Sequence, residues 1–283
     1  MKRIAALTVL SALVLSACNN GPVTPAAPEG VTAYGLVGGN QLATFGTANA
    51  AASYRAVSVT GLASGESLVD LDFRNTDNRL YAATSAGKIY VINTDTGAAT
   101  ADGSSVGKAT QAIDFNPNAN RLRVVGAAND NYRLTVGSDI ANDPTVDGTF
   151  VYAAGDINFG KTPMLTAAAY TNSYNDSATG AVPTGAPATT LYTIDSATDY
   201  LIENTVAPQF NTLASRSTLG VDVGTGLVGF DIAGANDAYM TAVLGNGTTL
   251  YRVNLNATSN AATAVSMISG VSIKALALKL PSR

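Results

Sequence analysis

Aspartates recur at equivalent positions of a repeated apolar-Asp-apolar phrase. The phrase is found as Leu71-Asp72-Phe73, Ile113-Asp114-Phe115 and Phe230-Asp231-Ile232. Three carboxylates directed into one central channel would offer oxygen ligands to a hard cation. In the alternative, each aspartate accepts backbone N–H bonds at the turn that joins two strands, because a repeated residue is what a repeated fold requires. We favour this structural role.

A second acidic segment could bind calcium. It runs from Asp139 to Gly148 and contains Asp139, Asn142, Asp143 and Asp147, which place four oxygen-bearing side chains in a short stretch. The segment lacks the spacing of an EF-hand and has no bidentate glutamate at its end. A solvated acidic turn is therefore the favoured alternative.

Arginines concentrate in one part of an otherwise acidic chain. Arg121, Arg123 and Arg133 could form a recognition patch for a carboxylate, a phosphate or a sugar. The neighbouring side chains expected to join this patch are Asn116, Tyr152, Asp156, Tyr170 and Asn172. A scaffold role is the favoured alternative, because Arg79 and Arg121 follow the same Asn in the repeat and we expect such arginines to pair with blade aspartates.

Histidine is absent from the chain, and Cys18 is its single cysteine. These facts exclude Ser-His-Asp and Cys-His nucleophiles, and also zinc or copper sites with imidazole ligands. A copper superoxide dismutase of the usual kind is therefore excluded. An antioxidant activity would need a metal site made of carboxylates, Met and Tyr.

The N-terminus predicts export and a lipid anchor. Residues 1–17 form a signal peptide, with Lys2 and Arg3 before a short apolar run, and Leu15-Ser16-Ala17-Cys18 matches the lipobox of bacterial lipoproteins. Residues 18–30 form a proline-rich tether, and 31–283 form a single domain. Asn19 after the cysteine favours the outer membrane. A soluble secreted protein cut nearby is the alternative.

Net charge excludes some partners. The chain has 16 basic and 20 acidic residues, and loss of Lys2 and Arg3 with the signal peptide leaves a net charge near −6. We therefore expect no nucleic-acid partner and no membrane contact through a basic face, so that the lipid is the only membrane attachment.

A two-part repeat predicts an all-β fold. The aspartate phrase leads through a turn to a second strand, and an apolar-Tyr-x-apolar-Asn/Asp phrase follows in each repeat, as in Ile89–Asn93, Leu191–Asp195 and Leu250–Asn254. The innermost strands recur about every forty to sixty residues, which is the size of a four-stranded propeller blade.

The two chain ends are expected to share one blade. Only one strand, Val271–Leu278, follows the fourth complete repeat, and three strands near 34–37, 41–45 and 54–59 precede the first. Joining them closes the ring and removes unpaired edges. We predict a five-bladed β-propeller; six or seven blades, an open propeller or a β-sandwich are the alternatives.

Several segments resemble the bacterial domain-of-unknown-function family numbered 4394. The resemblance covers nearly all of the mature chain and is carried by Phe115–Pro117, Asn120–Val125, Tyr132–Leu134, Tyr152–Asp156, Ala169–Ser173 and Thr190–Asp195. It implies an exported protein of propeller-type repeats, and it implies no reaction.

Two classes of function follow. The favoured one is a non-catalytic envelope lipoprotein that binds a protein or glycan partner in an outer-membrane or S-layer assembly. The alternative is a metal-dependent periplasmic or surface enzyme, such as a superoxide-handling factor.

Overall fold

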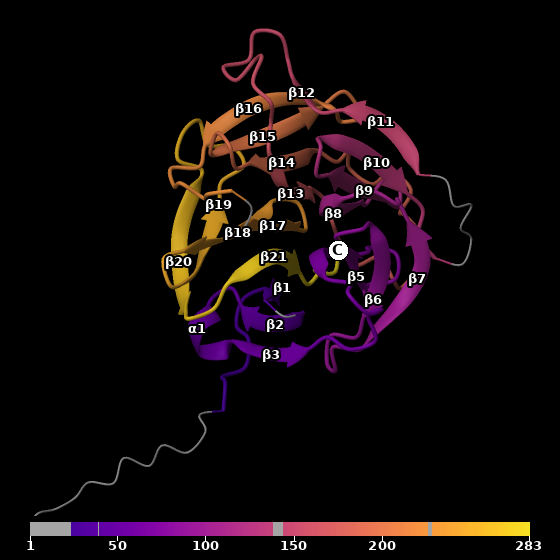
Figure 1. Cartoon of the computed structure of the whole chain (residues 1–283), viewed down its shortest axis with the longest axis vertical. Coiled ribbons are helices and arrows are strands. Elements are labelled where there is room, and N and C mark those ends of the chain that lie inside the picture. The colour runs from indigo at the N-terminus through magenta and orange to yellow at the C-terminus, as the bar shows by residue number, and fades with distance from the viewer. Residues whose placement is uncertain (1–23, 39, 138–143, 226–227) are drawn as a thin grey trace, which may run out of the picture.

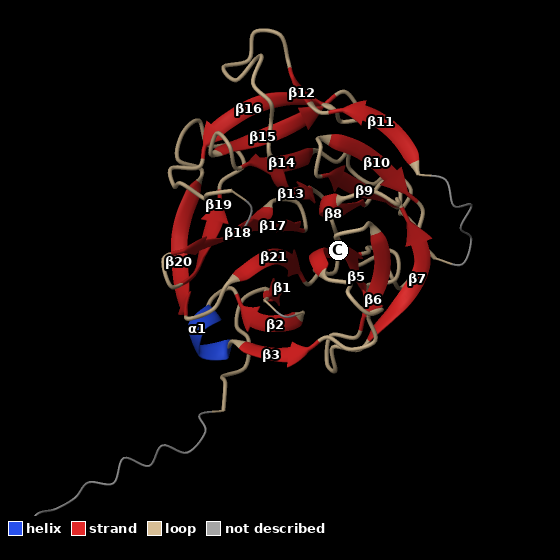
Figure 2. Cartoon of the chain, viewed as in Figure 1, coloured by secondary structure: helices blue, strands red, loops and turns tan. Residues whose placement is uncertain are grey.

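Five β-sheets surround a central axis (Figure 1). The computed structural model describes residues 24–38, 40–137, 144–225 and 228–283. Strands dominate these residues, and helix is confined to the single turn α1 (Ala50–Ser53) (Figure 2). The predicted all-β, five-bladed propeller is confirmed. No helix in the described part of the chain is long and apolar enough to cross a membrane.

The strands of blades 1, 2, 4 and 5 pair in antiparallel fashion, and one strand of each blade lies nearest the axis. Blade 1 contains β4 (Leu68–Phe73), β5 (Leu80–Thr84), β6 (Lys88–Ile92) and β7 (Ala99–Ser105). Blade 2 contains β8 (Thr110–Asn116), β9 (Arg121–Gly126), β10 (Asp130–Leu134) and β11 (Thr145–Thr149). Blade 4 contains β17 (Val228–Ala233), β18 (Asp237–Leu244), β19 (Gly247–Val253) and β20 (Ala262–Ser269).

Blade 5 joins the two ends of the chain, as predicted. Its order is β21 (Ile273–Leu278), β1 (Thr32–Val37), β2 (Gln41–Gly46) and β3 (Arg55–Ser58). The C-terminal strand pairs with the N-terminal one in antiparallel register, with Ala33 opposite Leu278 and Tyr34 opposite Ala277. These hydrogen bonds close the ring by joining the last strand of the chain to the first.

Blade 3 departs from the predicted four strands. Besides β13 (Leu165–Tyr170), β14 (Leu191–Asp195), β15 (Tyr200–Thr205) and β16 (Thr212–Thr218), it includes a two-residue strand, β12 (Val151–Tyr152). This strand pairs in parallel with β16. The extra strand forms because the chain leaves β11 at the outer edge of blade 2 and crosses directly to the outer edge of blade 3.

Apolar side chains fill the spaces between blades. Successive residues of an innermost strand point to opposite sides, so Leu71 and Phe73 pack toward blade 5, whereas Asp70 and Asp72 face blade 2. On that side Tyr81 and Phe115 meet edge to face, with ring centroids 5.1 Å apart. Burying each such ring contributes about 1.5–3 kcal/mol. This packing holds the innermost strands in fixed register around the axis.

Candidate functional site

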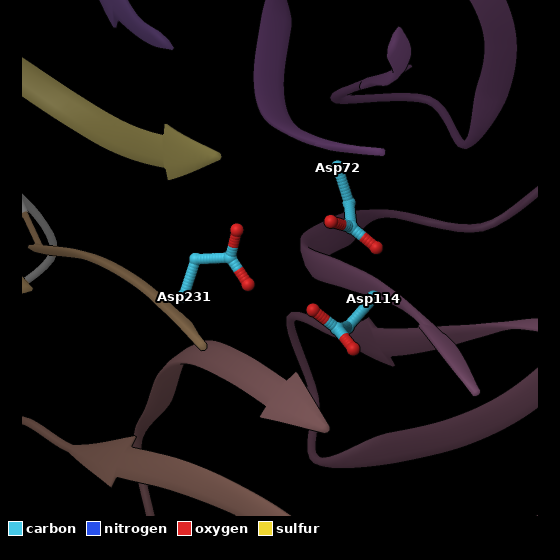
Figure 3. Close-up of side chains that lie close together, drawn as sticks. All are labelled: Asp72, Asp114 and Asp231. Atoms are coloured by element: carbon cyan, nitrogen blue, oxygen red, sulfur yellow. The ribbon is translucent and has the colours of Figure 1, made fainter. Parts of the chain in front are cut away.

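Three carboxylates converge at the axis of the propeller (Figure 3). β4, β8 and β17 carry Asp72, Asp114 and Asp231, whose side chains are 5%, 3% and 3% exposed. One oxygen of each lies within 4.8 Å of those of the other two. The repeated phrase of the sequence therefore places its aspartates in one buried cluster, which we call the axial trio.

Each member of the axial trio also connects its blade to the next. Asp72 Oδ2 accepts the backbone N–H of Phe115 at 2.7 Å, and Asp114 Oδ1 accepts that of Tyr170 at 2.9 Å. Asp231 Oδ2 accepts the N–H of Leu278 at 2.5 Å. These contacts are backbone hydrogen bonds, as in the favoured structural role, but they bridge innermost strands of neighbouring blades instead of capping turns within a blade.

A fourth axial carboxylate, Asp70, was not predicted from the sequence. Its Oδ2 accepts the backbone N–H of Ile113 at 2.8 Å. Ile113 lies two residues before Phe115, whose N–H is accepted by Asp72. The spacing of two residues between Asp70 and Asp72 was the available signal, since alternate residues of a strand share a face. At the positions equivalent to the axial trio, blades 3 and 5 carry Ala169 and Ala277, which are fully buried.

Burial perturbs the ionisation of these groups. It is the main cause that raises the pKa of Asp72 and of Asp114 well above the usual range, and neighbouring negative charges raise both further. Burial also raises the pKa of Asp231 to about 7. The axial trio therefore retains protons at a pH where surface carboxylates have lost them. Three converging oxygens also form a partial ligand set for a hard cation, which would need further oxygen ligands.

The loop from Asn172 to Ala188 bridges the ends of the innermost strands. Asp176 accepts hydrogen bonds from Asn75, which follows β4, and from the guanidinium of Arg283, at 2.7 Å for its Nε. The backbone of Asn175 donates to Pro281, which follows β21. The loop and the C-terminus thus cover the end of the axis nearest the axial trio.

The expected arginine patch is not an open site. Arg123 is fully buried: its Nη1 lies 2.6 Å from Asp147 Oδ2 and 2.6 Å from Asn131 Oδ1, and its Nε donates to the Tyr170 hydroxyl at 3.0 Å. Arg133 holds the same carboxylate through its Nε at 2.6 Å. Arg123 projects from β9 toward blade 3, where it joins the two blades instead of facing solvent, which agrees with the favoured scaffold role.

This network also occupies one residue of the expected calcium segment. Asp147 is 4% exposed, and both of its oxygens are engaged by guanidinium groups, so its carboxylate is committed to Arg123 and Arg133. The other three residues, Asp139, Asn142 and Asp143, lie outside the described residues. In the described part of the chain, Asp147 therefore belongs to the arginine network.

The remaining residues of the expected patch have separate local partners. Asn116 accepts two backbone N–H bonds in its own turn, and Arg121 donates to the backbone of Arg133. Tyr152 donates its hydroxyl to Asp195, Asp156 accepts from Ser215, and Asn172 donates to the backbone of Ala188. The structure therefore distributes these residues over several contacts and does not assemble them into one pocket.

Arg79 differs from its predicted role. We expected it to pair with a blade aspartate, but its exposed side chain forms no ion pair with any carboxylate among the described residues. It lies between two clefts on either side of blade 1. The blade 5–1 cleft has a volume of about 490 Å³ and the blade 1–2 cleft about 590 Å³. These clefts require side chains from neighbouring blades, which no local sequence pattern brings together.

Among three solved structures with some similarity to the chain, the first supports the fold alone. A structural genomics protein of unknown function from Bacteroides thetaiotaomicron is 14% identical, with a TM-score of 0.51 over 85% of this chain and 58% of that one. A chain of the nidogen/laminin complex is 10% identical, over 90% of this chain and 100% of that one, with a TM-score of 0.49. Hydrazine synthase of Kuenenia stuttgartiensis is 9% identical, over 74% and 51%, with a TM-score of 0.38.

No curated protein matches the chain. A family model, described as a domain of unknown function (DUF4394), matches residues 41–277. The match extends from β2 to the last strand, β21, and so includes strands of all five blades. It confirms the resemblance in the sequence, and the chain belongs to the domain-of-unknown-function family DUF4394.

Proposed function

We propose that this protein is a lipid-anchored, non-catalytic binding module of the bacterial outer membrane. The anchor is Cys18, the last residue of the lipobox and the single cysteine of the chain. Acyl chains stabilise membrane attachment by about 0.8 kcal/mol per buried CH₂, and more than one chain anchors a protein stably.

The path of the tether into the ring carries this proposal. Asn49, next to α1, accepts the backbone N–H of Glu29 at 3.0 Å and donates to the carbonyl of Ala27 at 2.9 Å. The backbone of Ala26 donates to Ala52 at 2.9 Å. The tether is thus fastened at the outer part of blade 5, beside α1 (Figure 1). A lipid at Cys18 would hold the ring by its rim and leave its faces accessible.

A rigid ring held in this way suits binding of a partner better than catalysis. The conspicuous polar groups are committed to the scaffold: the axial trio joins innermost strands, and Arg123 joins blades 2 and 3. The partner we propose is an envelope protein or glycan, in an outer-membrane or S-layer assembly.

Isolation of the native lipoprotein from gently solubilised envelopes tests this proposal. Co-purifying proteins and glycans would be identified by mass spectrometry, and metals counted on the same sample, with Cys18→Ala as the control that lacks the anchor. We expect a defined envelope complex with the wild type and none from membranes with the variant. A partner-free protein with a stoichiometric redox metal would refute the proposal and favour a superoxide-handling enzyme.

A further inference from the structure

We propose that the outer edge of blade 4 pairs with the same edge of a second copy of this chain. The edge is β20, which lies at the rim of the ring (Figure 1) and is the last strand of its sheet. The inference goes beyond the proposed binding function and does not depend on the lipid anchor. It is supported by the absence of charge on this strand, by outward backbone groups without partners, and by the self-complementarity of antiparallel pairing.

The other blades protect their outer edges. Native proteins do this with charged side chains, short strands or covering segments. β3 is short and begins with Arg55, β7 carries Asp102, and β11 carries Asp147. In blade 3, β12 covers part of β16, which carries Arg216. Blades 1, 2, 3 and 5 therefore each have a feature that opposes pairing with a further strand.

β20 has none of these features. It is 8 residues long, and no charged residue occurs in the chain between Arg252 and Lys274. No described strand pairs with its outer side. Its side chains include Val265 and Met267, which are 45% and 44% exposed. A long, uncharged edge strand with exposed apolar side chains is the kind of edge that pairs with another chain.

The outer side of β20 also offers unpaired backbone groups. The N–H of Gly270 donates to the carbonyl of Asn246, and hydrogen-bonded pairs alternate along an antiparallel ladder. The backbone of Ile268 is therefore bonded to β19, whereas Met267 and Ser269 direct their N–H and C=O groups outward. These outward groups form no hydrogen bond with any residue that the structure describes. They are free to bond with a further strand.

A second copy is the partner that this edge fits best. Two β20 strands related by a two-fold axis at Ile268 run antiparallel, so that Met267 of each copy lies opposite Ser269 of the other. In this register the outward N–H and C=O groups of both residues are used. A β-bulge at Val265 ends the regular edge on one side, and the turn at Gly270 ends it on the other. The paired segment is therefore short.

Charge also favours self-pairing at this part of the rim. The chain has 16 basic and 20 acidic residues, so two copies repel each other overall. Along the uncharged β20, two copies can approach without placing like charges opposite each other. Because the paired segment is short, we expect a weak dimer with a dissociation constant in the micromolar range.

Disulfide cross-linking of the full-length chain in its native membranes tests the inference. Met267→Cys with Ser269→Cys places thiols opposite each other in the proposed dimer, where Cα atoms about 5.5 Å apart permit a disulfide. Ala98→Cys with Thr100→Cys has the same spacing at an exposed part of blade 1, and the wild type reports cross-links through Cys18. We expect a covalent dimer with the first double variant and none with either control. Equal cross-linking by both double variants would overturn the inference, and so would cross-links to other proteins alone.

Sedimentation velocity of the detergent-solubilised full-length protein measures the same contact without added cysteines. We expect a monomer–dimer equilibrium for the wild type. Met267→Lys introduces one lysine from each copy at the shared edge and should weaken dimerisation about tenfold or more. Thr100→Lys adds the same charge to the exposed outer strand of blade 1 and should leave dimerisation unchanged. A wild type that is monomeric at every concentration would overturn the inference, as would equal effects of the two lysines.

Discussion

Replacing Asp114 by Asn should stabilise the propeller above neutral pH. Asp114 Oδ1 accepts the N–H of Tyr170, whereas no described residue donates a hydrogen bond to its Oδ2. The amide of Asn can keep the first bond and place its NH₂ group toward Asp72 and Asp231, the other members of the axial trio. The variant thus exchanges a repulsive charge for a hydrogen-bond donor.

The magnitude follows from the geometry of the axial trio. Its oxygens lie within 4.8 Å of one another, and two unit charges at about that distance repel by about 3 kcal/mol at an effective dielectric constant of 20. The pKa of Asp231 in the folded protein, about 7, exceeds the value of about 3.9 in an unfolded chain. At 1.36 kcal/mol per pH unit, this single group is responsible for about 4 kcal/mol of pH-dependent stability.

The sign of the pH dependence is fixed by the direction of the shift. Between pH about 4 and about 7 the folded state binds more protons at Asp231 than the unfolded state, so the free energy of unfolding decreases as the pH rises. The stabilisation is fully present below pH about 4 and is lost as the pH rises through about 7. Asp72 and Asp114, with pKa values also raised, should extend this decrease to higher pH.

Thermal unfolding from pH 5 to pH 8, with a chelator so that no cation neutralises the carboxylates, measures the effect. We expect the wild-type melting temperature to decrease with pH, and Asp114→Asn to melt roughly 10 °C higher than the wild type at pH 8, from a gain of about 3 kcal/mol. Asp222→Asn, which removes an exposed carboxylate, is the control and should follow the wild type. A wild-type melting temperature that does not decrease between pH 5 and pH 8 would refute this reasoning, as would equal destabilisation by Asp114→Asn at both pH values.

Three further substitutions test the scaffold. Arg123→Met should lower the free energy of unfolding by about 3–5 kcal/mol in urea titrations, because it removes the four hydrogen bonds of a buried guanidinium. A loss under about 1 kcal/mol would contradict the role of the network. Tyr152→Phe should lower the free energy of unfolding by about 1–3 kcal/mol in the same assay, because Asp195 loses a buried hydrogen-bond donor. An unchanged unfolding midpoint would argue against that bond. Asn49→Ala removes both side-chain bonds to the tether, so limited proteolysis should cut the tether faster while the ring stays intact; an unchanged rate would show that these bonds do not hold it.

The repeat in the sequence was sufficient to predict five blades and a closing blade made from both ends. A repeated apolar-Asp-apolar phrase fixes the spacing of innermost strands, and the incomplete last repeat requires its missing strands from the N-terminus. The strand β12 could not be predicted, because two residues show no periodicity and their pairing depends on distant β16.

Side-chain roles were harder to predict than strands. The arginines appeared as one patch because they are close in sequence, yet burial of Arg123 is decided by the side of β9 that packs against blade 3. Conversely, the axial aspartates were identified because a ring brings equivalent positions of its repeats together. The two clefts beside Arg79 could not be predicted, because their other lining residues come from blade 5 and blade 2.

The most direct test of the central claim is the mass of the mature N-terminus. Intact and peptide mass spectrometry of the protein purified from its native membranes would determine where the chain begins and what it carries. We predict a first residue of Cys18 bearing acyl chains, with the protein in the outer-membrane fraction. An unmodified chain that begins elsewhere and is recovered without the membrane would contradict it.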